Sequence, residues 1–432
     1  MALDVRYPGS IKAGKPILEP LPKGWKCAAL NAYLEPVARR ANLKDGQKYR
    51  LVTVKRSRGG VVQREWLSNK DISVKTQFYI EEGDFLISKR QIVHGACGIV
   101  PEELAGSIVS NEYCVFRGKE NFHLPYIKYL SATLYFQQTC FHSSIGVHVE
   151  KMIFKLESWF KWKFNIPPLY EQKRIARLLS TWDEAITVTE NLLVNSERRK
   201  KAMMQRLLTG GTRLPGFDGE WVEKRLSTLS SYIKGYTYKS EDYSDSPTDI
   251  GFLTLKSLQR GGGYSPRGMK YLKVEVDEKY LVEKGDIVFA VTDITRGAEI
   301  VGAPLIVPEL GVPKVAISMD MVKLEVNPGV SSNFLYYALK LRSSRNFMRA
   351  RASGSTVLHL DVKGSKKLKI RMPKSRAEQD AISQCLLTLD EHIAGLKLKI
   401  RLLKEEREAL IQQLLTGKRR VIIEEEAEAT TA

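Results

Sequence analysis

The sequence predicts a mixed α/β (α+β) protein built from two tandem modules, each followed by a long helix. The main observation is a repeat, because Glu171-Gln172-x-x-Ile175 returns as Glu378-Gln379-x-x-Ile382, 207 residues later. Two further motifs return at the same separation: Asp183-x-x-Ile186 as Asp390-x-x-Ile393, and Leu207-Leu208-Thr209-Gly210 as Leu414-Leu415-Thr416-Gly417. A period this long indicates duplication of a whole domain, since solenoid repeats span about 20–50 residues.

The segments between the repeated endings contain the same elements in the same order. Each has a β-rich run before a glycine turn, a second run entered from a Gly-Asp turn, and a helical patch that carries tyrosines. In the first module these lie at 49–54, 84–88 and 126–130, and in the second at 252–255, 286–290 and 334–338. We therefore expect two related modules whose intervening residues differ.

The repeated endings are predicted to be long helices that pair. Apolar residues alternate at spacings of three and four, which is typical of a coiled-coil seam. The predicted seam residues are Ile175, Leu179, Trp182, Ile186, Leu193, Met203, Leu207, Ile382, Leu386, Leu389, Ile393, Leu396, Ile400, Leu403, Leu410 and Leu414. Each helix starts after proline and stops at glycine. Lys200 and Arg407 occupy equivalent seam positions, as a register signal or as two cations that reach out to solvent.

These boundaries divide the chain into six segments. They are an N-terminal extension (1–20), module 1 (21–167), helix 1 (168–210), module 2 (211–373), helix 2 (374–417) and a disordered tail (418–432).

The charge of the chain indicates a polyanionic partner. The 432 residues carry a formal net charge of +19, and nearly all of the excess lies in the two modules rather than in the helices. Neutralising phosphates requires such an asymmetry, although a merely basic protein with solvated faces is the alternative.

The odd number of cysteines, five, and the lack of C-x-x-C spacing indicate a reducing compartment. With no apolar stretch for a signal peptide or membrane span, we expect a cytoplasmic protein without a membrane partner.

Two variable modules, each followed by a helix that opens with Pro-x(3,4)-Glu-Gln-x-x-Ile and closes with Leu-Leu-Thr-Gly, resemble the specificity subunit of type I restriction-modification systems. The resemblance covers residues 21–417. It implies two target recognition domains that each read one half of a bipartite, asymmetric site in double-stranded DNA. It also implies an antiparallel, pseudo-twofold coiled coil that sets the spacing and docks two methyltransferase subunits and, through them, the restriction and translocase subunits. The first helix departs from the pattern, with Thr189 and Ser196 where the second has Leu396 and Leu403.

Base reading favours Arg, Lys, Asn, Gln, Ser and Thr on loops held by a sheet. The DNA-binding candidates of module 1 are Lys55, Arg56, Arg58, Lys89, Arg90, Gln91, His94, His142, Ser143, Ser144 and His148. Those of module 2 are Lys256, Gln259, Arg260, Thr292, Thr295, Arg296, Arg345, Arg349, Arg351, Ser355, Thr356 and His359. For any single residue, solvation at the surface is the competing interpretation.

No catalytic site is expected on this chain. It has no phosphate-binding loop and no G-x-G-x-x-G motif. Asn165-Ile166-Pro167-Pro168, Asp277-Glu278-Lys279 and Cys140-x-His142 are better explained as a helix-entry turn, a charged turn and an incomplete ligand set than as methyltransferase, nuclease or metal sites. We expect no metal or cofactor here, with S-adenosylmethionine, ATP and Mg²⁺ on partner subunits as the resemblance implies. The alternatives are a stand-alone nuclease or methyltransferase, a DNA-binding protein outside a restriction complex, and a basic coiled-coil scaffold.

Overall fold

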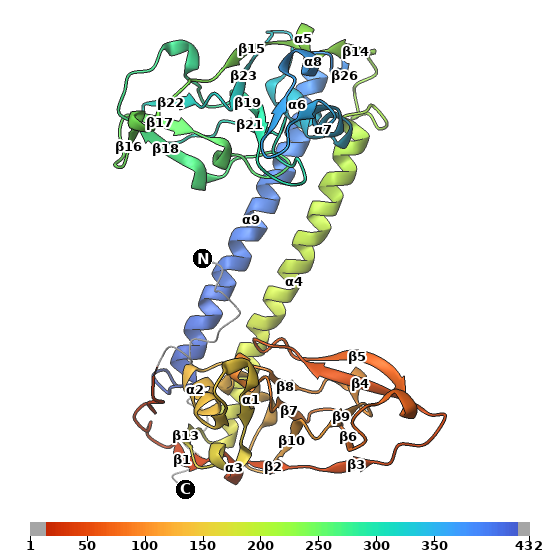
Figure 1. Cartoon of the computed structure of the whole chain (residues 1–432), viewed down its shortest axis with the longest axis vertical. Helices are drawn as coiled ribbons and strands as arrows, with labels where there is room; N and C mark the ends of the chain where they lie inside the picture. The colour runs from red at the N-terminus through yellow and green to blue at the C-terminus, as the bar shows by residue number, and fades with distance from the viewer. Residues whose placement is uncertain (1–13, 422–432) are drawn as a thin grey trace. The chain divides into compact units, whose positions relative to one another are not determined.

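The structure is a computed structural model, and it describes residues 14–421. The chain divides into two compact units, each made of one module and parts of both long helices (Figure 1). Unit 1 combines the chain up to Glu190 with the chain from Lys399 onward, and unit 2 is Asn191–Leu398. The long helices are α4 (Leu169–Leu207) and α9 (Arg376–Leu414), 39 residues each.

The module of unit 1 contains three short helices and thirteen strands among the described residues. The helices are α1 (Leu124–Leu130), α2 (Leu134–His142) and α3 (Leu156–Trp159). The strands are β1 (Lys26–Ala29), β2 (Leu34–Pro36), β3 (Arg39–Ala41), β4 (Lys48–Val54), β5 (Val61–Ser68), β6 (Gln77–Tyr79), β7 (Phe85–Ser88), β8 (Cys97–Ile99), β9 (Ile108–Ser110), β10 (Tyr113–Gly118), β11 (Ser144–Ile145), β12 (Ile153–Phe154) and β13 (Lys163–Ile166).

The module of unit 2 contains four short helices and thirteen strands among the described residues. Its helices are α5 (Leu226–Leu229), α6 (Ser332–Lys340), α7 (Arg342–Arg349) and α8 (Val362–Ser365). Its strands are β14 (Trp221–Arg225), β15 (Ser230–Lys234), β16 (Tyr243–Ser244), β17 (Ile250–Leu253), β18 (Met269–Leu272), β19 (Ile287–Ala290), β20 (Thr292–Asp293), β21 (Pro304–Ile306), β22 (Lys314–Ile317), β23 (Met321–Val326), β24 (Ala352–Ser353), β25 (Leu358–Leu360) and β26 (Lys369–Pro373).

The sheets of the two modules correspond, which confirms the predicted duplication. A four-stranded antiparallel sheet has the order β2-β10-β7-β8 in unit 1 and β15-β23-β19-β21 in unit 2. A second sheet has the order β3-β6-β9-β4-β5 in one unit and β16-β18-β17-β22 in the other, and each includes one parallel pair. A two-stranded ribbon, β1-β13 or β14-β26, leads directly into the long helix. The mixed α/β class is therefore confirmed.

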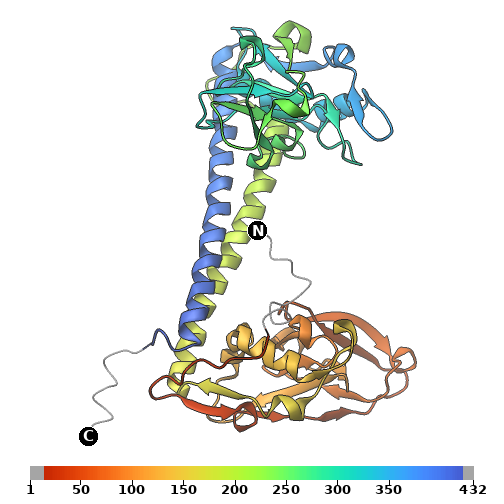
Figure 2. The same ribbon diagram turned by 60° about the vertical axis from the view of Figure 1, so that its left-hand side comes forward.

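The core of each module lies between the first four-stranded sheet and a pair of short helices. In unit 1, α1 and α2 lie on one face of the sheet (Figures 1 and 2), and Tyr126 and Phe136 are fully buried in one cluster with Phe85 and Phe116 of the strands. Fully burying such side chains contributes roughly 1.5–3 kcal/mol each. Because the helices and strands pack into one core, they hold the loops between them in fixed positions.

The long helices run antiparallel within each unit. None of the predicted seam hydrophobics is exposed. In unit 1, the Arg407 Nε donates to Asp183 Oδ1 at 2.5 Å, and in unit 2 Lys200 Nζ donates to Asp390 Oδ1. Asp183 corresponds to Asp390, and Arg407 to Lys200, at the separation of 207, so the two ion pairs are equivalent. The interpretation of Lys200 and Arg407 as a register signal is therefore confirmed, and the interpretation that they reach out to solvent is wrong.

A buried glutamate starts each long helix. In unit 1, Arg420 donates two hydrogen bonds to the Glu171 carboxylate, at 2.7 and 2.8 Å, and the Trp25 indole donates a third at 3.0 Å. We call this group of three residues the Glu171 cluster. The Glu171 side chain is fully buried, so its charge is compensated by the Arg420 guanidinium and not by water.

The equivalent group in unit 2, the Glu378 cluster, consists of Glu378, Arg213 and Trp221. The Arg213 guanidinium donates to both Glu378 oxygens at 2.6 and 2.8 Å, and the Trp221 indole donates at 3.3 Å. Each arginine follows the Leu-Leu-Thr-Gly end of the other long helix. The repeated motifs at the two helix ends are therefore joined to each other in space.

The glutamine of each repeated motif fixes a short helix to a long one. Gln172 accepts a hydrogen bond from the backbone N–H of His123, just before α1, at 2.8 Å. Gln379 accepts one from the N–H of Ser331, the N-cap of α6, at 2.9 Å. The Glu-Gln pair is thus structural, and it explains why the motif recurs.

Several predicted boundaries need adjustment. The helices begin and end within the predicted limits of 168–210 and 374–417. The prediction of a tail from Lys418 is wrong for residues 418–421, because Arg420 belongs to the Glu171 cluster. Residues 1–13 and 422–432, in the predicted extension and tail, lie outside the described residues.

Candidate nucleic-acid interface

The first candidate loop of unit 1 is the turn between β4 and β5, residues 55–60. Ser57 and Arg58 have positive φ values of 56° and 57°, a conformation that costs non-glycine residues about 1–3 kcal/mol. Two hydrogen bonds hold this backbone: the Ser57 N–H donates to the His94 carbonyl at 2.7 Å and the Arg58 N–H to the Gly95 carbonyl at 2.8 Å. The strained turn is thereby fastened to the second candidate loop, residues 89–96.

Side chains also connect these two loops. The Arg56 Nε donates to Gln91 Oε1 at 2.8 Å, and its Nη2 donates to Glu150 Oε2 at 2.7 Å. Glu150 belongs to the 3₁₀ turn Val149–Lys151, directly after candidate His148. These contacts bring candidates from three separate segments to one exposed region of unit 1.

Arg90 and Lys89 lie at the edge of this region. The Arg90 guanidinium pairs with Glu112, with its Nε 2.5 Å from Oε2, and Glu112 raises the pKa of the exposed Arg90. Lys89 Nζ donates to the Asn111 carbonyl at 2.7 Å. His142 is exposed, and its Nε2 lies 3.0 Å from the Gly14 carbonyl oxygen. Lys55 and His148 are exposed as well.

The corresponding loops of unit 2 also meet. The N–H of Gly261 donates to the Glu299 carbonyl at 2.9 Å, joining the 256–263 loop to the 291–300 loop as Ser57 joins its counterpart. An ion pair of 3.2 Å between Arg260 and the Glu299 carboxylate adds a side-chain link. Lys256, Gln259 and Arg296 are exposed.

Asp293 organises the 291–300 loop. Its side chain is buried and accepts hydrogen bonds from three backbone N–H groups, those of Thr295 and Ile300 at 2.6 Å and of Val301 at 2.8 Å. Burial alone would raise the pKa of Asp293, but these hydrogen bonds outweigh it and lower the pKa below its usual 3.8. The carboxylate therefore fixes the loop that carries Thr295 and Arg296.

The arginines of α7 contact the same loop from its other side. Arg345 donates to the carbonyls of Val301 at 2.6 Å and Glu299 at 3.0 Å, and Arg349 donates to the carbonyl of Ala298 at 2.9 Å. Ala298 has a positive φ of 49°. Among the described residues, the non-glycine positions with positive φ are Ser57, Arg58 and Ala298, and all three lie in candidate loops.

His359 lines a separate cavity of about 460 Å³ in unit 2. β25 carries His359 and pairs with β20, so that His359 is opposite Thr292. Tyr232 and Lys366 also line this cavity, where Lys366 Nζ lies 4.9 Å from the centre of the Tyr232 ring. Burial raises the pKa of Tyr232 to about 12. Ser355 and Thr356 are exposed on the turn before β25, and Arg351 is half-buried with its guanidinium against the Phe347 ring.

Five candidates are buried in their modules and are removed from the proposed surface. They are His94, Ser143, Ser144, Thr292 and Arg345, all less than 9% exposed. The serine and threonine side chains bond inside the fold. Ser144 donates to the Cys140 carbonyl, Ser143 accepts from the Trp162 indole, and Thr292 donates to Asp320. Side chains so enclosed lack the exposure that reading a base edge requires.

Sequence reasoning missed Ala298, Asp293 and Lys366. The residues around Ala298 give no sign of its unusual backbone conformation. The Asp293-x-Thr295 spacing, in contrast, is typical of an aspartate that accepts a hydrogen bond from the backbone two residues on, so the role of Asp293 could have been predicted.

The weaker catalytic interpretations are also explained by structure. Asn165 Nδ2 donates to the Glu19 carbonyl at 2.9 Å, and Asp277 pairs with Lys279 at 2.9 Å in an exposed turn. Cys140 is fully buried. Within residues 14–421, no group of three or more His, Cys, Asp and Glu side chains is arranged to hold a metal ion. The helices of that same range include none with the length and apolar character needed to cross a membrane.

Known proteins show where this architecture recurs. Residues 35–195 and 218–404 match the family model described as type I restriction modification DNA specificity domain. The chain is 24% identical over 288 residues to the type I restriction enzyme MjaVIII specificity subunit of Methanocaldococcus jannaschii, covering 63% of this chain and 65% of that protein. It is 25% identical over 277 residues to the putative MjaX specificity subunit of the same organism, covering 60% of each. The match thus spans less than two thirds of these relatives.

Solved structures share the fold. The HsdS subunit from Thermoanaerobacter tengcongensis superposes with a TM-score of 0.50 and 18% identity, covering 92% of this chain and 98% of that one. The type I restriction-modification S subunit from M. genitalium does so with a TM-score of 0.58 and 14% identity, covering 93% and 98%.

Proposed function

Because this chain belongs to the family of type I restriction-modification DNA specificity proteins, we propose that it is the sequence-reading, non-catalytic subunit of such a system. Each module reads one half of a bipartite site in double-stranded DNA. The observation that carries this proposal is the convergence, in each unit, of separate basic loops on one exposed region, 55–60 with 89–96 and 256–263 with 291–300. Phosphate contacts position such loops and base-edge contacts give them specificity.

The proposed DNA-contacting residues, whether they bind phosphates or base edges, are the exposed and half-buried candidates. In unit 1 they are Lys55, Arg56, Arg58, Lys89, Arg90, Gln91, His142 and His148. In unit 2 they are Lys256, Gln259, Arg260, Thr295, Arg296, Arg349, Arg351, Ser355, Thr356 and His359.

A module exchange tests this function. Residues from about 21 to 166 are replaced by the first module of another family member, and adenine methylation is mapped by single-molecule sequencing of cellular DNA. We expect one half-site to change and the other to remain. The matched control exchanges 211–373 and should alter the opposite half-site. A change in both half-sites after either exchange would contradict independent reading.

We propose that two methyltransferase subunits dock along the long helices and that restriction and translocase subunits join through them. Apolar side chains exposed on the helices support docking, because Val188 is 53% exposed, Leu192 50% and Leu398 47%. S-adenosylmethionine, ATP and Mg²⁺ are assigned to those partners, and the complex to the cytoplasm. Size-exclusion chromatography with light scattering should give two methyltransferases per chain, and a stable one-to-one complex at saturating partner would contradict this.

The helices are proposed to set the number of unread base pairs between the half-sites. At 1.5 Å per residue, a 39-residue helix is about 58 Å long. Four residues inserted after Thr209 add roughly 6 Å if they continue the helix, close to two base pairs at about 3.4 Å each. The methylated site should then keep both half-sites with a changed spacer. Activity that stays on the original spacing would reject this role.

A basic scaffold without sequence specificity, or a DNA-binding protein outside a restriction complex, remains the second candidate. A scaffold function does not account for the strained backbone of the loops 55–60 and 291–300. Absence of methylation in cells that carry this chain together with a methyltransferase subunit that binds it would favour the second candidate.

A further inference from the structure

The two units contain equivalent cavities where the module meets the long helices. The unit 2 cavity, about 490 Å³, is walled by Lys200, Met204 and Asp390 of the helices. The unit 1 cavity, about 610 Å³, is walled by Arg407, Ile411 and Asp183, the residues 207 positions away from them. A candidate reading loop reaches each cavity, through Arg58 in unit 1 and Gly261 in unit 2.

In the unit 1 cavity the cations are largely neutralised. Asp183 accepts from Lys128 Nζ at 2.6 Å and from Arg407 Nε at 2.5 Å. Lys404 pairs with Glu190 at 2.7 Å. Arg58 makes a long hydrogen bond of 3.4 Å to the Ser131 carbonyl and no carboxylate contact among the described residues. Only a small excess of positive charge therefore faces this cavity.

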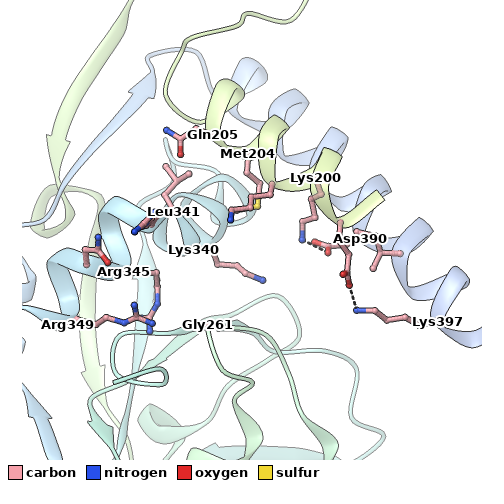
Figure 3. A pocket seen from close by; sticks show the side chains of 15 residues that line it. Lys200, Met204, Gln205, Gly261, Lys340, Leu341, Arg345, Arg349, Asp390 and Lys397 are labelled. Carbon is pink, nitrogen blue, oxygen red and sulfur yellow. Dashed lines mark hydrogen bonds and ion pairs between the residues drawn. The ribbon is translucent and has the colours of Figure 1, made fainter. Parts of the chain in front are cut away.

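The unit 2 cavity has three cations whose partners are all uncharged oxygens. Lys340 Nζ donates to the Tyr336 hydroxyl at 3.1 Å, and Arg345 and Arg349 donate to backbone carbonyls of the 291–300 loop and of Val301. Within residues 14–421, none of the three has a carboxylate within ion-pair distance. Figure 3 shows Lys340 pointing into the cavity from the module, with Lys397 reaching toward it from α9. Lys397 is already paired with Glu197 at 2.8 Å.

Burial makes this cluster electrostatically costly without an anion. Burial and, to a smaller extent, the neighbouring Arg349 charge lower the pKa of Arg345 to about 10, although the Asp293 carboxylate acts in the opposite direction. Burial also lowers the pKa of Lys340. Arg345 is 5% exposed, and its Nε has no hydrogen-bond partner. Lys340 is half-buried and Arg349 is exposed beside the buried Arg345. Because a buried charge is normally paired, three adjacent cations without a carboxylate partner indicate a place for a negative ligand.

The backbone is shaped to bring these cations together. Gly302 has a φ of +65°, and a Cβ there would lie 2.5 Å from Met348 Cβ and 3.2 Å from Arg345 Nη1. Gly262 has a φ of +110°, and its Cβ would lie 2.7 Å from the Pro304 carbonyl oxygen. A side chain at position 302 would collide with Met348 and press on the Arg345 guanidinium, so glycine leaves room for both.

We propose that the unit 2 cavity binds a backbone phosphate of duplex DNA, with Lys340 and Arg349 as its ligands and Arg345 as the residue that positions Arg349 and the 291–300 loop. The proposal rests on the proposed function. A phosphodiester is favoured because the loop against these arginines carries the reading candidates Thr295 and Arg296, so a phosphate held here would set the register of the bases beside it. The unit 1 positions at the same separation are Thr133, Gln138 and His142, and unit 1 lacks this clamp.

The test uses the complex of the full chain with its methyltransferase subunits and measures duplex binding by fluorescence anisotropy between about 50 and 200 mM KCl. Two duplexes are compared, one with the methylated site and one scrambled. Lys340→Gln and Arg349→Gln should each reduce the slope of log affinity against log salt by about one and weaken both duplexes alike. Arg349→Lys should retain the slope, and the control Lys404→Gln should leave it unchanged because Glu190 already neutralises Lys404.

Three results would overturn the proposal: an unchanged slope in both glutamine variants, a loss confined to the methylated site, or release of the methyltransferase in light scattering. Competition by inorganic tripolyphosphate with an unchanged DNA slope would assign the cavity to a free phosphate instead. Wild-type complex that does not distinguish the two duplexes would contradict the proposed function itself. A thermal melting curve that matches wild type confirms that a variant is folded. If Lys340→Gln does not fold, the variant Arg349→Gln, at an exposed position, still tests the proposal.

Discussion

In unit 1 the buried Glu171 carboxylate is held by Arg420 and Trp25, and in unit 2 Glu378 is held by Arg213 and Trp221 with the same donors and similar distances. The cavities beside the long helices differ, because three cations of the unit 2 cavity have no carboxylate partner, whereas Lys128, Lys404 and Arg407 of the unit 1 cavity are paired with carboxylates. Residues that recur at the separation of 207 join elements of the scaffold. Residues that differ between the units line the surfaces offered to a ligand. The comparison separates what holds this protein together from what it recognises.

The largest expected effect comes from the two glutamate clusters. Arg213→Met and Arg420→Met each leave a buried carboxylate with only an indole donor, and removing one partner of a buried ion pair costs about 3–5 kcal/mol. We expect similar losses in the free energy of unfolding for both variants, measured by urea denaturation. The exposed pair Lys374–Glu220 supplies the control, Lys374→Met, with a loss under about 1 kcal/mol. A large loss in one unit alone would show that the clusters are not equivalent.

The next effect distinguishes the units. Asp293→Asn should destabilise unit 2 by about 2 kcal/mol, because a charged acceptor of three backbone N–H groups is lost. The folded pKa of Asp293 lies below 3.8, so its stabilisation is present above pH 3.8 and disappears as the pH falls through the lowered pKa. The difference between wild type and variant should shrink below about pH 4. The control Asp218→Asn, at an exposed position, should change the free energy of unfolding by less than about 0.5 kcal/mol.

A smaller effect is expected at the pairs along the seam. Asp183→Asn weakens contacts with Lys128, Tyr129 and Arg407, and we expect a loss of about 1–2 kcal/mol because the group is partly exposed to water. Asp390→Asn should cost a similar amount through Lys200 and Tyr337. Thermal unfolding of both single variants and of the double variant measures this. Strong non-additivity would indicate that the two sites are coupled.

The smallest effect tests backbone strain in the 291–300 loop. Ala298→Gly relieves a positive φ and should stabilise the protein by about 0.5–1 kcal/mol. Ala350→Gly, at the exposed end of α7 with a φ of −64°, should destabilise it by a similar amount. Urea denaturation should therefore give changes of opposite sign in the free energy of unfolding of the two variants. A loss at both positions would mean that packing of the Ala298 methyl group outweighs the strain.

Much of the fold was predictable because it has a local signature. The seam follows from apolar spacing, and the strands at 49–54 and 84–88 follow from residue type and the glycine turns beside them. The partners of Glu171 and Glu378 were not predictable, because Arg420 and Arg213 contact them from 249 and 165 residues away. The two arginines do recur at the separation of 207, but their local sequence does not indicate which residues they contact.

The candidate site was predicted less completely than the fold. The structure brings the candidate loops of each module together, 55–60 with 89–96 and 256–263 with 291–300. Whether a given side chain faces water depends on packing between elements, so His94 and Thr292 could not be separated from Arg56 and Arg296 by residue type. Lys340 was not chosen at all, because its significance depends on the absence of a carboxylate across the cavity.

The position of Arg420 has a practical consequence for anyone who shortens or tags this chain. A stop codon after Gly417 removes no part of either long helix, yet it takes away the guanidinium that neutralises Glu171, a residue encoded before the middle of the gene. The damage would appear in the first module and, under the proposed function, in the half-site that this module reads, while the second module kept its own arginine at 213. A truncation at the 3′ end of the reading frame would thus be detected as a defect in the module encoded at its 5′ end.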